Sequence, residues 1–76
     1  MKARVRVSTE AELRLGIVEA GRLARDAGLT GQEANKFVTA VSELGRNILK
    51  YAGAGEIALQ QLQSDGRPGM EAIVSD

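Results

Sequence analysis

Hydrophobic and charged residues alternate at the start of the chain. Arg4 and Arg6 fall on one face of an extended segment, and Val5 and Val7 fall on the other. A period of two is typical of a β-strand that buries one face and leaves the other in water. We therefore expect a strand over residues 2–7.

The pattern changes to a helical period after Thr9. Thr9 followed by Glu12 is the signature of a capping box, in which the hydroxyl accepts from a backbone N–H and the carboxylate reaches back to the cap. Gly28 suits the left-handed conformation that ends many helices. We expect a helix between these signals, and its interior glycines, Gly16 and Gly21, indicate a close neighbour. The inward positions of this helix are Leu13, Ile17, Ala20, Ala24 and Ala27.

A second helix is predicted after a short connection. Thr30 and Glu33 form another capping box, and the short link makes the two helices neighbours in space. An apolar stripe about five turns long follows, and Gly53 and Gly55 end it. The stripe consists of Ala34, Phe37, Val38, Val41, Leu44, Ile48 and Ala52.

The segment 56–63 has the composition of a second strand. Ile57 and Leu59 share one face, whereas Leu62 is out of phase with them. We expect a bulge or an early end of the strand near Leu62.

A third strand is expected over residues 70–75, after a hairpin loop at 64–69 that is dense in turn-forming residues. Ile73 and Val74 are apolar at consecutive positions, as in a strand that is covered on both faces. The order strand, helix, helix, strand, strand predicts an α+β fold with both helices on one face of a mostly antiparallel sheet. The last strand is left with an open edge, so we expect another chain or further residues to complete the sheet.

Composition narrows the chemistry that is open to this chain. Its 76 residues suffice for one small domain, and the absence of cysteine and histidine excludes disulfides, thiolate metal sites and histidine bases. Ten acidic residues balance ten basic ones, so the net charge gives no reason to expect nucleic acid or an anionic membrane as a partner. Neither a membrane-spanning run nor a signal peptide is apparent, and we expect a soluble, cytoplasmic protein.

Four polar residues gather late in the second helix: Glu43, Asn47, Lys50 and Tyr51. At about 100° per residue, they fall in one arc of the helix and could contact a single ligand. A solvated helix face would have the same spacing, so the spacing leaves both interpretations open.

The pattern Glu43-x-x-x-Asn47-x-x-Lys50-Tyr51 resembles the N box of the GHKL (Bergerat-fold) ATPases and kinases. Within that superfamily, residues 41–48 and the following Tyr51-Ala52-Gly53 are similar to the anti-sigma regulatory serine/threonine kinases of the RsbT type. The resemblance follows the predicted element order over essentially the whole chain, and it implies an incomplete GHKL fold.

The resemblance implies a role for each of five residues. Asn47 would provide its side-chain oxygen to the Mg²⁺ that bridges the phosphates of ATP. Glu43 would be the general base for an acceptor serine hydroxyl. Lys50 matches a position near the phosphates, and Tyr51 one near the nucleotide base. Asp76 matches the first residue of the G1 box, whose carboxylate accepts a hydrogen bond from the adenine amino group.

Some of these residues have simpler interpretations. Lys50 could be a partner of Glu43 on a solvated face, and Tyr51 could lie at the edge of the core. Gly45 stands within the motif where a better helix former would be expected, and it lowers the stability of the helix by about 1 kcal/mol. The sequence ends at Asp76, before the glycines of the G1 box and the ATP lid. We therefore expect the amino-terminal part of a kinase domain, inactive alone.

Four hypotheses on function follow. The first is a stressosome serine/threonine kinase, for which the resemblance implies STAS-domain scaffold and antagonist proteins as substrates and a PP2C-type phosphatase as the downstream partner. The second is a non-catalytic module that binds a STAS protein or forms a homodimer through the open sheet. The third is a hydrolytic ATPase or a histidine kinase, which Glu43 and the small size disfavour. The fourth is an α+β domain without a nucleotide site.

Overall fold

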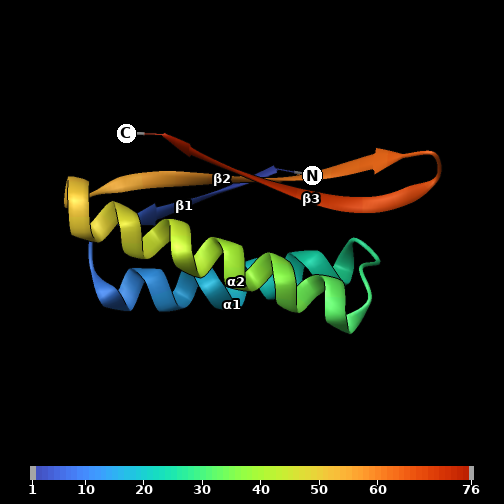
Figure 1. Cartoon of the computed structure of the whole chain (residues 1–76), viewed down its shortest axis with the longest axis horizontal. Helices are drawn as coiled ribbons and strands as arrows, with labels where there is room; N and C mark the ends of the chain where they lie inside the picture. The colour runs from blue at the N-terminus through green and yellow to red at the C-terminus, as the bar shows by residue number, and fades with distance from the viewer. Residues whose placement is uncertain (1, 76) are drawn as a thin grey trace.

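The computed structural model describes residues 2–75, which form two helices packed on a three-stranded antiparallel sheet (Figure 1). This arrangement confirms the predicted α+β class and the predicted order of elements. The elements are β1 (Lys2–Val7), α1 (Glu10–Asp26), α2 (Gly31–Asn47), a π-helical turn η1 (Ile48–Ala52), β2 (Gly55–Ser64) and β3 (Arg67–Ser75).

The sheet has the strand order β1-β2-β3, with β2 in the centre and both neighbours antiparallel to it. Ile57 of β2 is the partner of Val5 on one side and of Val74 on the other. Both helices lie on the same face of the sheet (Figure 1). Within residues 2–75, the outer edges of β1 and β3 pair with no other strand, as predicted for the third strand.

The core lies between the sheet and the two helices. Val5 and Val7 are buried while Arg4 and Arg6 are exposed, which confirms that β1 buries one face. The same alternation in β2 buries the side chains of Ile57 and Leu59 against the helices. The other large buried side chains are Leu13 and Leu23 of α1, Val41 of α2 and Ile48 of η1.

The two helix starts differ in how they are capped. The Thr30 hydroxyl accepts from the Glu33 N–H at 3.1 Å, and the Glu33 carboxylate accepts from the Thr30 N–H at 2.9 Å, so the second capping box is confirmed. The first box is not formed as predicted. Thr9 does accept from the Glu12 N–H, but the Glu12 carboxylate accepts from the hydroxyl and the N–H of Ser8, at 2.6 and 2.7 Å. The Glu12 carboxylate thus binds one residue before the predicted cap, because Ser8 offers both a hydroxyl and a backbone N–H as donors.

Two buried glycines set the spacing of α1 from its neighbours. A Cβ atom at Gly16 would overlap the side chain of Val5 in β1, and one at Gly45 would overlap that of Leu13. The prediction of a close neighbour beside α1 is thereby confirmed at Gly16. Gly45 allows α1 and α2 to approach each other within the segment that carries the candidate site.

The hairpin between β2 and β3 is tighter than the sequence predicted. Asp65 and Gly66 both have positive φ, 53° and 74°, as the type I′ turn of a two-residue hairpin requires. The strands pair without interruption from Glu56 to Ser64, so the expected bulge at Leu62 is wrong. Leu62 instead lies on the face away from the helices and is 40% exposed.

The end of β3 is less covered than its sequence suggested. Ile73 and Val74 point to opposite faces of the sheet and are 49% and 40% exposed. Within residues 2–75, no element covers Ile73, because both helices lie on the other face. In this described part of the chain, no helix is both long and apolar enough to cross a membrane.

Candidate functional site

The candidate site lies on the carboxyl-terminal half of α2 and on η1. The apolar stripe of α2 fixes the rotation of the helix, because Ala34 and Val41 are buried and Phe37 packs against the core. Glu43 and Asn47 are consequently exposed, one turn apart on the regular part of the helix. Among residues 2–75, neither side chain has an ion pair or a side-chain hydrogen bond.

The helix widens immediately after Asn47. Its last turn is π-helical, and the Gly53 N–H donates to the carbonyl oxygen of Ile48 at 2.8 Å, five residues back. Gly53 then ends the helix with a φ of 80°. Because a π-helical turn closes over five residues, the spacing of 100° per residue holds only as far as Asn47. The angles of Lys50 and Tyr51 around the helix axis therefore differ from those that a regular helix predicts.

Lys50 and Tyr51 contact each other on this wide turn. The Lys50 Nζ atom lies 5.2 Å from the centroid of the Tyr51 ring, which is the range of a cation–π interaction. Tyr51 is 76% exposed, so the interpretation as a core-edge residue is wrong. Lys50 forms no ion pair with Glu43 among the described residues, although both lie in solvent. An exposed ammonium group and an exposed ring thus stand side by side, one turn after Asn47.

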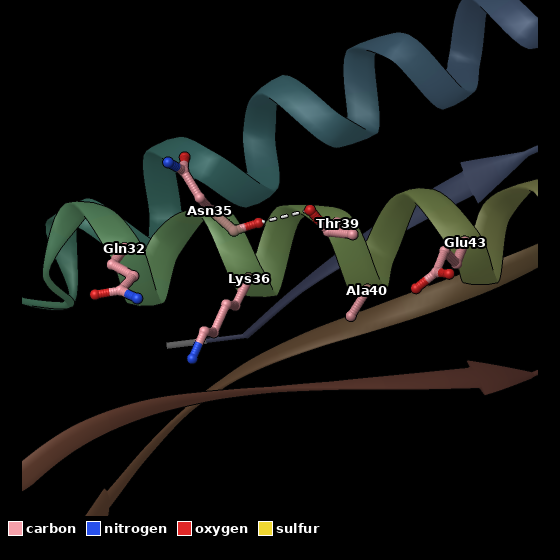
Figure 2. A pocket seen from close by; sticks show the side chains of 6 residues that line it. All are labelled: Gln32, Asn35, Lys36, Thr39, Ala40 and Glu43. Atoms are coloured by element: carbon pink, nitrogen blue, oxygen red, sulfur yellow. Dashed lines mark hydrogen bonds between the residues drawn. The ribbon is translucent and has the colours of Figure 1, made fainter.

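An open groove of about 550 Å³ runs along α2 and ends at Glu43 (Figure 2). Figure 2 shows the side chains of Gln32 and Lys36 extending from the opposite side of the helix to that of Asn35. The Thr39 hydroxyl donates to the carbonyl oxygen of Asn35 at 2.9 Å and is therefore occupied. The groove is lined by Gln32, Asn35, Lys36, Thr39, Ala40 and Glu43. Most of these residues were not singled out in the sequence, because isolated polar residues on a helix look like an ordinary solvated face.

The end of β3 approaches the end of α2. A Cβ atom at position 55 would lie 3.1 Å from the Cγ2 atom of Ile48 and 3.1 Å from the carbonyl oxygen of Ser75. Gly55 thus allows the last described residue of β3 to lie beside the residue that follows Asn47. Figure 1 shows both segments at the same end of the molecule. Asp76, the predicted adenine-binding residue, lies outside the described residues.

The residues present suit a metal that brings most of its own ligands. Residues 2–75 contain no group of three Asp or Glu side chains that could enclose a metal ion. Mg²⁺ at nucleotide sites takes few protein oxygens and is held mainly by phosphates and water. The free amide oxygen of Asn47, with the Glu43 carboxylate one turn away, is compatible with that kind of site.

Comparison with known proteins finds similarity to a serine/threonine-protein kinase, in agreement with the resemblance noted in the sequence. The chain is similar to Serine/threonine-protein kinase RsbT of Bacillus subtilis (strain 168), with 36% identity over 73 residues. The match covers 95% of this chain and 54% of RsbT, so the chain spans about half the length of this curated relative. No family model matches the sequence, and no solved structure matches it significantly.

Proposed function

We propose that the chain carries the part of an ATP-dependent protein serine/threonine kinase that supplies the catalytic base and a magnesium ligand. The observation that carries the proposal is the pair of exposed, unpaired side chains Glu43 and Asn47, one turn apart on α2. Its support is the 36% identity to a serine/threonine-protein kinase over nearly the whole chain. A merely solvated helix face explains the exposure but not this similarity.

Nucleotide binding is assigned to Asn47, just before the wide turn, and to Lys50 and Tyr51 within it. Asn47 would hold Mg²⁺ through its amide oxygen, and the bound ion would neutralise charge on the phosphates of ATP. Lys50 would lie near the phosphates and Tyr51 near the base. Both side chains are exposed and therefore accessible to a nucleotide. Asp76, which lies outside the described residues, would accept a hydrogen bond from the adenine amino group.

Glu43 is assigned the transfer of the proton. Its carboxylate would accept the proton of an acceptor serine or threonine hydroxyl while that oxygen attacks the terminal phosphate. The groove that ends at Glu43 leaves room for an acceptor to approach from the amino-terminal side of α2. By the resemblance to RsbT-type kinases, we propose STAS-domain scaffold and antagonist proteins as substrates and a PP2C-type phosphatase as a downstream partner.

Calorimetric titration with Mg²⁺–ATP tests the proposal. It is carried out on this chain and on a version extended through the predicted glycine-rich boxes, each with and without Asn47→Ala. We expect binding by the extended chain, weakened at least about tenfold by Asn47→Ala, and unchanged binding for Asn35→Ala on the same helix. Binding by neither version, or binding that is indifferent to Asn47→Ala, would overturn the proposed site.

A second candidate function is a non-catalytic interaction module. The observation that favours it is the uncovered end of β3, where Ile73 and Val74 are half exposed beside a free strand edge. A homodimer through this edge would bury both side chains. Sedimentation equilibrium decides this point: self-association lost in Ile73→Lys supports the module, and a monomer at all accessible concentrations contradicts the homodimer.

A further inference from the structure

The outer edge of β1 is a second free edge, on the side of the sheet opposite to β3. Within residues 2–75, the strand Lys2–Val7 pairs only with β2. The backbone N–H and C=O groups on its outer side are therefore open to another strand. We call the strand Lys2–Val7, together with the exposed side chains of Leu15 and Val18 on α1, the β1 edge.

The β1 edge has a row of cations on one face. Lys2, Arg4 and Arg6 all point away from the helices and are exposed. Arg4 is paired with Glu56 of β2 at 3.1 Å, whereas no described residue forms an ion pair with Lys2 or Arg6. Because side chains directly opposite each other on adjacent strands interact, a strand added here would face these cations. Acidic residues are the favourable choice at those positions.

The other face of the β1 edge offers apolar surface. α1 lies close against β1, because Gly16 has no side chain where Val5 packs. Leu15 and Val18, one turn apart on α1, are 72% and 70% exposed. An open groove of about 290 Å³ runs between Arg4 and Arg6 of β1 and Leu15 of α1. An added strand would therefore find apolar contacts on the side that faces α1.

The acidic residues in this groove leave the cations available. Glu12 accepts hydrogen bonds from Ser8 at 2.6 and 2.7 Å. Glu19 is paired with Arg22 at 2.8 Å. Both carboxylates are thus engaged within α1 and its cap, and neither neutralises Arg6 through a direct contact.

A second copy of this chain does not suit the β1 edge. Two β1 strands related by a two-fold axis would continue the sheet in antiparallel pairing. On the sheet face away from the helices, the cations of one copy would then lie beside the same cations of the other copy. These cations are Lys2, Arg4 and Arg6. Like charges directly opposite each other destabilise a strand pair. The occupant must carry a different charge pattern.

We propose that the β1 edge binds an extended segment of another protein as an additional strand, with acidic residues opposite Lys2 and Arg6 and apolar residues toward Leu15 and Val18. The main-chain hydrogen bonds supply affinity and the alternating side chains supply specificity. The proposal does not depend on nucleotide binding, since α2 and η1 take no part in the β1 edge.

The test uses the whole chain and a fluorescent short peptide that alternates glutamate and valine, measured by fluorescence anisotropy. We expect binding that weakens at least about tenfold with Arg6→Glu and with Leu15→Gln. The matched variants Arg14→Glu, elsewhere on α1, and Leu62→Gln, at the far end of β2, should bind as the wild type does. All four positions are exposed, so we expect the variants to retain the fold, and circular dichroism checks this.

Two further peptides separate strand addition from general attraction. A version methylated on alternate backbone nitrogens cannot complete the ladder, and a lysine–valine version has the wrong charge, so neither should bind. The proposal is overturned by equal binding of either control peptide, by Arg6→Glu and Leu15→Gln variants that bind normally, or by no binding of the acidic peptide. Self-association that Leu15→Gln abolishes would show a second copy as the occupant and would likewise overturn it.

Discussion

The two helices have the same length, 17 residues, but use their exposed charges differently. On α1, Arg22 is paired with both Glu19 and Asp26, at 2.8 and 3.1 Å, so these charges satisfy one another. On α2, the exposed Glu43, Asn47 and Lys36 have no such partner among residues 2–75. Surface pairs of the first kind contribute little to stability. Arg46 of α2 does pair with Glu10 of α1 at 3.9 Å, and Arg14 and Arg25 of α1 are exposed without an ion pair among residues 2–75. The candidate functional helix is therefore distinguished by its unpaired carboxylate and amide one turn apart, Glu43 and Asn47, and not by unpaired charge alone.

Removal of the Glu43 carboxylate should affect activity more than any other single change. In a version of the chain extended through the predicted glycine-rich boxes, Glu43→Gln should lower phosphoryl transfer by about 10²- to 10⁴-fold, since it removes the proposed general base. Mg²⁺–ATP binding and folding should remain. The matched change Glu19→Gln on α1 should leave transfer unchanged. Phosphate incorporation from labelled ATP measures the difference, and equal activity of the two variants would contradict the role of Glu43.

The contact between the helices gives the next effect. Gly45→Ala should destabilise the fold by about 1–3 kcal/mol, because its Cβ would overlap the buried side chain of Leu13. This loss exceeds the gain of up to about 1 kcal/mol in helix propensity. In the Leu13→Val background, Gly45→Ala should cost less. Urea denaturation of the four proteins gives the coupling, and strict additivity would contradict the assigned contact.

The capping box at the start of α2 gives a smaller effect. Thr30→Ala should cost about 1 kcal/mol, because the Glu33 N–H loses its acceptor. Thr39→Ala serves as the control within α2, since its hydroxyl donates only to a carbonyl inside the helix. Thermal unfolding measures both variants. A loss at Thr39 that equals the loss at Thr30 would show that the cap has no special role.

The same cap predicts how stability depends on pH. The backbone N–H and the hydroxyl of Thr30 lower the pKa of Glu33 below its ordinary value. The folded state therefore binds its proton less readily than the unfolded state, so this contribution is present above about pH 5 and is lost as the pH falls through the folded pKa. The stability difference between wild type and Glu33→Gln should shrink on acidification. Unfolding curves at several pH values check it, and a difference that grows toward low pH would reverse the sign.

The elements themselves could be predicted because each has a local signal. Alternation in residues 2–7 and the cap at Thr30 both led to the correct elements. Gly28 and Gly53 do adopt the positive φ expected of helix ends, 101° and 80°. The hairpin was placed correctly but made too long, since Asp65 and Gly66 alone form the turn.

The rest depended on contacts between residues distant in sequence. The fit of Gly45 against Leu13 joins positions 32 apart, and a pattern along one helix cannot reveal it. The π-helical turn at Ile48 follows an apolar spacing that also fits an ordinary helix, so the pattern along the chain does not predict it. Glu43 and Asn47 were singled out by helical spacing and then by resemblance; both are exposed, and their roles stay predictions.

The most direct test of the difference between the helices is a backbone amide NMR titration of the extended chain with Mg²⁺–ATP. We expect shifts concentrated at Glu43, Asn47, Lys50 and Tyr51, with the amides of Glu19 and Arg22 on α1 unchanged. Saturation of the sample without shifts at Glu43 and Asn47, or with equal shifts on the exposed face of α1, would contradict the assignment of α2 as the functional helix.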